Sequence, residues 1–295
     1  MIKFNLQYKI TVQDRDFNDV IISSFSEVFK DNQYCPTVDI TVNKNNFSQG
    51  NNAKIIIYNL GKNTRKNLKK SIIDTTINRQ IIIEAGYQTY TTIIFVGNIS
   101  SCFSYRESEN IITEINCNNA FPVENSKINL SIKEDKNILN TMVNNLKDTN
   151  IGYITKNNIL KVSYRGRSFQ GKVWDIINEN NEDLDIFIDD KKLYIMAEDE
   201  IKSTDKVILD NETGLLQEPK EYDGYIELKT VFEPLATLNG EVVLNSELLP
   251  EYNGSYKCIG FNHKITISKI GGSSDGITTW KLLYSYENFK KINNR

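Results

Sequence analysis

The single histidine, His263, is the first residue whose chemistry invites a functional interpretation, because an imidazole titrates near neutral pH and can serve as a general base. It stands in the segment Gly260-Phe261-Asn262-His263-Lys264, which we place between two strands. No serine or cysteine with a nucleophile motif accompanies it. We therefore favour a polar residue at a strand end or a domain seam over a catalytic base.

Acidic residues crowd two short segments in the middle of the chain. A glycoside hydrolase needs two carboxylates at a fixed separation across a sugar cleft. These carboxylates, however, are predicted at a helix end and at hairpin turns, where acidic side chains normally face water. We therefore expect them to be solvated rather than catalytic. The residues are Glu179, Glu182, Asp183, Asp185, Asp189 and Asp190, followed by Glu198, Asp199 and Glu200.

The sequence predicts no catalytic residue, no cofactor and no metal site, and hence a protein that is not an enzyme. It lacks the common phosphate-binding, dinucleotide-binding, zinc-protease and serine-hydrolase motifs, and it has no calcium-loop spacing. One histidine cannot build a multi-histidine metal centre. No C-x-x-C pair is present, so we expect free, buried thiols at Cys35, Cys102, Cys117 and Cys258.

Basic residues gather in residues 62–70 and at Arg165-Gly166-Arg167, and the second cluster lies near Tyr164 and Phe169. Basic and aromatic residues together can form a nucleic-acid surface. The formal net charge of −3 instead favours a solvated helix face and no nucleic-acid recognition. The N-terminus lacks the apolar core of a signal peptide. The longest apolar runs fall far short of the roughly 20 residues of a membrane span, so we expect no membrane insertion.

The chain has 295 residues, of which 39% are hydrophobic and 25% charged, enough for about two domains with real cores. The predicted fold class is mainly β with an α+β insert. Two barrel-like β domains, residues 1–125 and 206–295, flank a small helical and hairpin domain, residues 126–205. We expect the β-branched strands near Ile55 and Ile81 to have edges that a closed oligomer covers.

Alternation of apolar and polar residues predicts strands in both outer regions. The middle region has helical spacing at residues 138–146 and again at residues 168–180, with Trp174 and Ile177 on the apolar face of the second helix. A short helix is expected at residues 62–73, and a hairpin turns at Asp189-Asp190-Lys191-Lys192. The strands are predicted at residues 4–12, 20–29, 37–42, 53–60, 79–85, 92–99, 103–106, 111–117, 185–188, 193–196, 225–232, 241–244, 255–261, 264–270 and 278–284.

Four patterns follow one another in the first region. They are an apolar strand with Tyr58-Asn59-Leu60, a short helix opened by Thr64-Arg65, a strand ending in Ala85-Gly86-Tyr87, and a strand with Phe95-Val96-Gly97-Asn98-Ile99. In this order they resemble the first domain of bacteriophage tail baseplate hub proteins. The middle segment with Trp174-Asp175-Ile176-Ile177 looks like that family's insert. The segment from Asn253 to His263, with Trp280-Lys281-Leu282, is similar to its second β domain.

The resemblance implies a structural hub of a contractile phage tail or of a phage-tail-like bacteriocin. Such hubs are homotrimers whose ring adapts the sixfold tail tube to the threefold spike. The implied partners are the spike protein, tail tube or tube-initiator proteins, and other baseplate proteins. The implied location is the host cytoplasm during assembly and then the baseplate of the virion tail or tail-like particle. Two alternatives remain: a tail-associated cell-wall hydrolase, and a hub-like distal component of a long flexible tail.

Overall fold

The protein is mainly β, as the alternation predicts. The computed structural model describes residues 5–24, 35–46, 50–71, 73, 78–88, 90–119, 127–132, 152–155, 167–172, 174–176, 184–198, 200–202, 206–268 and 274–283. The helix expected at residues 138–146 lies outside the described residues. Among the residues that are described, no helix is long and apolar enough to cross a membrane.

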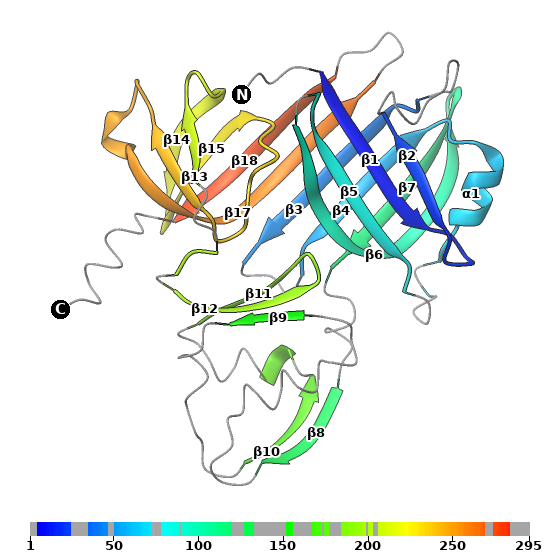
Figure 1. Cartoon of the computed structure of the whole chain (residues 1–295), viewed down its shortest axis with the longest axis horizontal. Coiled ribbons are helices and arrows are strands. Elements are labelled where there is room, and N and C mark those ends of the chain that lie inside the picture. Colours follow the sequence, from blue (N-terminus) through cyan, green and yellow to red (C-terminus); the bar gives the residue numbers. More distant parts are fainter. Residues whose placement is uncertain are drawn as a thin grey trace.

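The first lobe of the molecule contains seven strands and one short helix (Figure 1). Its strands carry apolar residues at alternate positions, which face one core that includes Tyr8, Ile40, Ile55 and Phe95. The elements are β1 (Leu6–Gln13), β2 (Asp19–Ser23), β3 (Val38–Asn45), β4 (Asn52–Tyr58), α1 (Lys62–Leu68), β5 (Gln80–Tyr87), β6 (Tyr90–Glu107) and β7 (Asn110–Asn118).

Strand β6 runs without a break for 18 residues, so the prediction of separate strands at residues 92–99 and 103–106, the first broken by Gly97, is wrong. Gly97 lies within the strand because it leaves room for its neighbours. A Cβ there would lie 2.6 Å from the Phe95 ring and 2.9 Å from the carbonyl oxygen of Asn118. The glycine therefore serves close packing and does not end the strand.

The described residues of the middle region form two small sheets. Strands β8 (Lys127–Ile132) and β10 (Arg167–Lys172) pair with each other, and β12 (Lys192–Ala197) pairs with both β9 (Gly152–Thr155) and β11 (Leu184–Asp189). The predicted hairpin β11–β12 is confirmed.

The helix predicted from residue 168 is wrong over β10, where Phe169 lies opposite Leu130 and Gly171 has a φ of 144° that no helix contains. Only residues 174–176 are helical in the described part of that stretch, and Trp174 among them is buried. Ile177 lies outside the described residues.

The second lobe is formed by β13 (Lys206–Asp210), β14 (Leu215–Tyr222), β15 (Tyr225–Val231), β16 (Glu241–Asn245), β17 (Gly254–Ile267), β18 (Asp275–Leu283) and the short helix η4 (Pro250–Tyr252). A second core includes Leu228, Leu244, Phe261 and Trp280. Strand β17 spans 14 residues, where the sequence predicts two strands with His263 between them. His263 therefore lies inside a strand.

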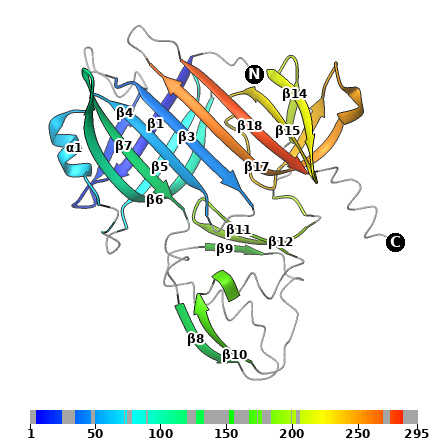
Figure 2. The ribbon, with the colours of Figure 1, turned by 180° about the vertical axis from the view of Figure 1, so that it is seen from behind.

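One 13-stranded sheet joins the two lobes, in the order β14-β15-β18-β17-β3-β4-β7-β6-β5-β1-β2, with β13 and β16 beside this path. Strand β17 is the shared element, because its first half pairs with β16 and its second half with β3 (Figure 2). No closed barrel is detected among the described strands, since β2 and β14 stand at open ends of this order.

The strands that were expected to form edges are interior. Strand β4, which carries Ile55, pairs with β3 and β7, and β5, which carries Ile81, pairs with β1 and β6. The β-branched runs belong in the middle because Ile55 and Ile81 are fully buried on the core face.

Candidate functional site at a buried ionic junction

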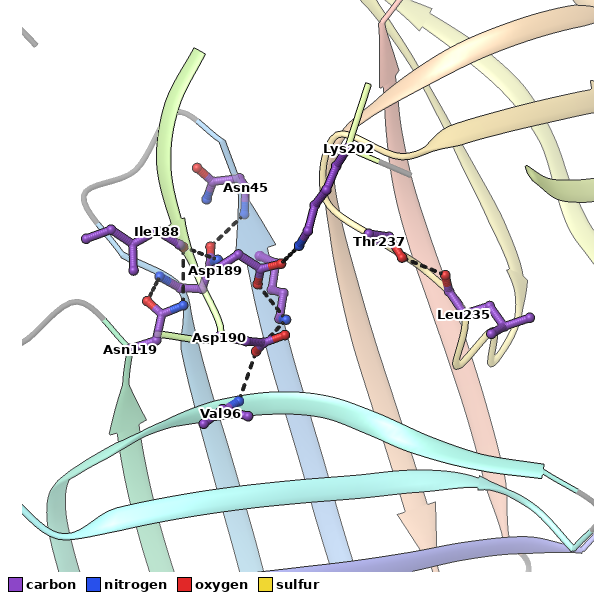
Figure 3. A network of polar contacts seen from close by, with 11 residues as sticks. Asn45, Val96, Asn119, Ile188, Asp189, Asp190, Lys202, Leu235 and Thr237 are labelled. Atoms are coloured by element: carbon purple, nitrogen blue, oxygen red, sulfur yellow. Dashed lines mark hydrogen bonds and ion pairs between the residues drawn. The ribbon is translucent and has the colours of Figure 1, made fainter. Parts of the chain in front are cut away.

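The tip of the β11–β12 hairpin is a tight turn that carries two carboxylates. Asp190 and Lys191 form it, and both have positive φ values, 46° and 62°. Such a two-residue turn matches the twist of the flanking strands. In Figure 3 the labelled Asp189 and Asp190 lie between Lys202 on one side and Val96 on the other. The turn thereby places both carboxylates against the end of the large sheet.

Lys44 meets both carboxylates from β3. It follows Val38, Ile40 and Val42 at alternate positions, so its side chain lies on the same face as these core residues. Its Nζ lies 2.7 Å from Oδ1 of Asp189 and 2.9 Å from Oδ1 of Asp190. The other oxygen of Asp189, Oδ2, accepts from Lys202 Nζ at 2.6 Å. Both oxygens of Asp189 are thus held by ammonium groups.

The electrostatics of this cluster keep Asp189 and Lys44 in their charged forms. Burial by itself would raise the pKa of Asp189, but Lys44 and Lys202 outweigh burial and hold this pKa at about 2. Burial by itself would lower the pKa of Lys44, and the two carboxylates instead raise it above its usual value. Neither group exchanges a proton near neutral pH.

Backbone and amide groups of the first lobe complete the junction. The Val96 N–H donates to Oδ1 of Asp190 at 3.0 Å, and Asn51 Nδ2 donates to the Ile188 carbonyl at 2.9 Å. Asn119 donates to the same carbonyl at 3.3 Å. Figure 3 shows these bonds converging on the end of β11. The loop between β3 and β4 and the loop after β7 therefore hold the hairpin turn in one position.

The second lobe holds the other end of the hairpin. Lys257 of β17 forms an ion pair with Asp185 Oδ2 and donates to the Glu198 carbonyl at 2.7 Å. Asn239 Nδ2 donates to Asp185 Oδ2 at 2.9 Å. Phe187, Tyr194 and Met196 of the hairpin join the second core. Both lobes thus contact the hairpin, and its charged turn faces the first lobe.

The expectation that the acidic residues are solvated is wrong for Asp185, Asp189 and Asp190 of the hairpin, whereas Glu198 is exposed as expected. Asp189 is only 2% exposed, and Asp185 and Asp190 form ion pairs. Glu200 accepts a hydrogen bond from the Ala197 N–H at 3.1 Å. Glu179, Glu182, Asp183 and Asp199 lie outside the described residues. Sequence alone gives one signal for the junction: a lysine at a core position of an alternating strand.

His263 lies at the seam of the two lobes, opposite Val42 of β3 and Thr278 of β18. Its Nδ1 is 2.9 Å from Thr278 Oγ1, which accepts a hydrogen bond from the Glu233 N–H. Burial, and to a lesser degree Lys44, lowers the pKa of His263 to about 3. The imidazole is therefore neutral and out of contact with solvent, and a seam residue is the interpretation that the geometry supports.

The remaining candidates from the sequence are the cysteines, a metal site and the basic clusters. The four cysteines are buried and free. Burial raises the pKa of the Cys258 thiol to about 12. Within the described part of the chain, no group of three or more potential ligands could hold a metal ion. Helix α1 buries Leu68 and leaves most of its basic residues solvated, while Arg165 and Gly166 lie outside the described residues.

The fold with this continuous sheet is similar to that of solved phage tail proteins. A tail protein from Neisseria meningitidis MC58 superimposes with a TM-score of 0.63 at 7% identity, over 96% of this chain and 97% of that one. The 43 kDa tail protein of prophage MuSo2 from Shewanella oneidensis gives a TM-score of 0.64 at 7% identity, over 93% and 96%. The Francisella PdpA–VgrG complex gives 0.61 at 11%, over 97% of this chain and 59% of that one.

The sequence itself shows which family the chain belongs to. The family described as baseplate hub gp41 matches residues 27–268, which is most of the chain. The chain therefore belongs to the baseplate hub gp41 family, and the resemblance to baseplate hub proteins is confirmed. No curated protein matches the sequence.

Proposed function

We propose that the protein is a structural, non-enzymatic subunit of the baseplate hub, and that three copies form a ring between the sixfold tail tube and the threefold spike. The single observation that carries this proposal is the family match over residues 27–268. Its partners are then the spike protein, tube or tube-initiator proteins and other baseplate proteins. The chain assembles in the host cytoplasm and ends in the baseplate of a contractile tail or tail-like bacteriocin.

The two lobes suit this role. Each has its own apolar core, and β17 fixes one lobe against the other. Three copies of a chain with two β modules present six modules, which is the simplest way for a threefold ring to meet a sixfold one. The division into regions 1–125, 126–205 and 206–295 is part of this proposal. Phe232, Ile265 and Ile267 of the last region enter the first core, so the outer regions share a boundary.

The ionic junction supports a positioning role over catalysis. A carboxylate that acts as an acid, a base or a nucleophile needs an open side for its substrate. Both oxygens of Asp189 are occupied by lysines, and Asp185 is held by Lys257 and Asn239. These groups hold the β11–β12 hairpin in a fixed position on the two lobes, as a structural subunit requires.

The test is the mass of the purified chain by light scattering across micromolar concentrations, alone and with the spike protein. We expect a trimer in at least one of these conditions. A strict monomer that also ignores spike and tube proteins would refute the ring. A zymogram on host peptidoglycan tests the hydrolase alternative separately, and we expect no clearing from this chain.

A further inference from the structure

A pocket of about 350 Å³ opens on the large sheet, and residues of β3, β15, β17 and β18 line it, Lys44 and Phe261 among them. Its polar side chains come from three adjacent strands, at positions that alternate with the core residues. Asn262 of β17 lies between Asn43 of β3 and Thr279 of β18 in one cross-strand row. The next row contains Asn45, Gly260 and Lys281.

The hollow exists because of a glycine and a bulge. Gly260 contributes no side chain to the middle of its row, and a Cβ there would lie 3.1 Å from the Lys44 carbonyl oxygen. The register of β17 against β18 shifts between Cys258 and Gly260, which places Ile259 in the pocket lining. β-Bulges and strand glycines often mark places where another group approaches the backbone.

Four polar side chains of the pocket have spare binding capacity. The side chains of Asn43, Asn262 and Thr279 make no hydrogen bond within the described part of the chain. Lys281 makes no ion pair there, and its Nζ lies 5.5 Å from the centroid of the Tyr225 ring. Tyr225 stacks on Tyr222 at 5.3 Å between centroids, which extends an aromatic rim away from the pocket.

These groups match one class of ligand. A carboxamide donates and accepts at once, as a peptide group does, so Asn43 and Asn262 suit an extended backbone. The ammonium of Lys281 suits a carboxylate. The volume is at the small end of ligand sites and fits a side chain with its flanking peptide groups. We propose that this pocket binds an acidic side chain, together with its adjoining backbone, of a partner polypeptide.

The local charges favour a polypeptide over a nucleic acid. Glu227 lies in register between Lys220 of β14 and Lys281 of β18, so a carboxylate separates the two lysines. A continuous phosphate backbone would meet that carboxylate, whereas a peptide can present one acidic group at Lys281 and neutral groups beside it.

The pocket is also held in shape before any ligand binds. Lys44, which also lines the pocket, stands between Asn43 and Asn45, and its ammonium is fixed by Asp189 and Asp190. The Asn45 N–H donates to Asn51 Oδ1 at 2.9 Å. A site whose groups are already fixed loses less conformational entropy on binding. The proposal depends on the proposed function only for the source of the partner, which would be another baseplate protein.

The experiment titrates the full chain into a fluorescent, end-blocked heptapeptide with one acidic residue, Gly-Ser-Ser-Glu-Ser-Ser-Gly, and follows anisotropy. The comparison peptide has glutamine in place of the glutamate. The pocket variants are Lys281→Met and Asn262→Ala. The matched control is Lys264→Met, because Lys264 lies on the same face of β17, two residues from Asn262, and does not line the pocket.

We expect saturable binding of the acidic peptide that weakens at least about tenfold in Lys281→Met, as loss of a charge-assisted hydrogen bond predicts. Asn262→Ala should also weaken it, and Lys264→Met should leave it within about twofold. No binding up to about 1 mM peptide, equal loss in Lys264→Met, or a single-stranded oligonucleotide that binds more tightly than the peptide would each overturn the proposal.

Light scattering of the same samples separates the two proposals. A chain that binds the peptide through Lys281 but stays monomeric, also with spike and tube proteins, would support the pocket and refute the ring. A trimer that ignores the peptide would do the reverse.

Discussion

One face of β3 passes from an apolar seam to a buried ion network within two residues. The strand pairs with β17 along eight residues, from Val38 to Asn45, and its inward side chains up to Val42 pack into the first core. At Lys44 the same face meets Asp189 and Asp190. The seam joins the two lobes through backbone hydrogen bonds and apolar contacts, whereas charges hold the hairpin turn against the first lobe.

The apolar seam and the charged junction contribute in different ways, because the first stabilises the fold and the second fixes the position of the hairpin. Burial of apolar surface is non-directional and supplies most of the free energy of folding. A buried ion pair adds little net free energy because desolvation offsets its attraction, but removal of one partner is costly. The charges at Lys44 therefore select one placement of the hairpin, since any other placement would leave a buried ion unpaired. The seam supplies stability and the junction supplies geometry.

The largest expected change in the free energy of unfolding comes from a substitution in an apolar core. Trp280 is fully buried in the second core, and its Nε1 donates to Thr230 Oγ1 at 2.9 Å. Trp280→Ala should lower the free energy of unfolding by about 3–5 kcal/mol, because it leaves a large cavity and removes the donor to that hydroxyl. Denaturant melts measure this change. A loss below about 1 kcal/mol would show that the second core does not depend on this side chain.

Removal of one charge from the junction should cost about 3 kcal/mol, because Asp190 is left without its ammonium partner and Asp189 keeps only Lys202. Lys44→Met, which keeps most of the side-chain volume, tests this in the same melts. The control is Lys54→Met, since Lys54 pairs with Glu114 at 3.0 Å but is 48% exposed. Its loss should stay below about 1 kcal/mol. Equal effects of the two substitutions would contradict a buried network.

The seam, which contains His263, and the junction, which contains Asp189, should also differ in how they make stability depend on pH, and this effect is smaller. In the unfolded chain His263 binds a proton below the ordinary histidine pKa of 6.5, whereas the folded residue stays neutral down to a pKa of about 3. Stability is therefore lost as pH falls from 6.5, by about 2 kcal/mol at pH 5. The pKa of Asp189, lowered from 3.8 to about 2, contributes stability above 3.8 that is lost only as pH falls towards 2.

His263→Gln should flatten the pH dependence of unfolding between about pH 7.5 and 5, because it removes the group that titrates there only in the unfolded chain. Lys44→Met serves as the comparison and should keep a downward slope over that interval. An unchanged slope in His263→Gln would mean that the folded imidazole accepts a proton in this range.

Sequence reasoning succeeded where one local pattern decides the structure. Alternation located β1 and β3, a β-branched run located β4, and the turn residues Asp189-Asp190-Lys191-Lys192 located the hairpin. It failed where distant partners decide. Gly97 looks like a strand end until Phe95 and Asn118 are placed around it, and β10 has helical spacing until β8 pairs with it.

The junction was missed for the same reason. Acidic residues at a turn normally face water, and only the folded chain brings Lys44 and Lys202 to Asp189. The edges were misplaced because a β-branched run signals a strand but does not reveal how many neighbours that strand has. The family, by contrast, could be inferred from the order of short patterns, because that order is itself a property of the sequence.

Hydrogen exchange of Lys44→Met against the unsubstituted chain tests the central claim, that buried charges position the hairpin while the seam stabilises the lobes. The account predicts faster exchange of amides in β11, β12 and at Val96, whose N–H binds Asp190, with β3 and β17 unchanged. Uniform acceleration across the sheet, or no change at Val96 and in the hairpin, would contradict it.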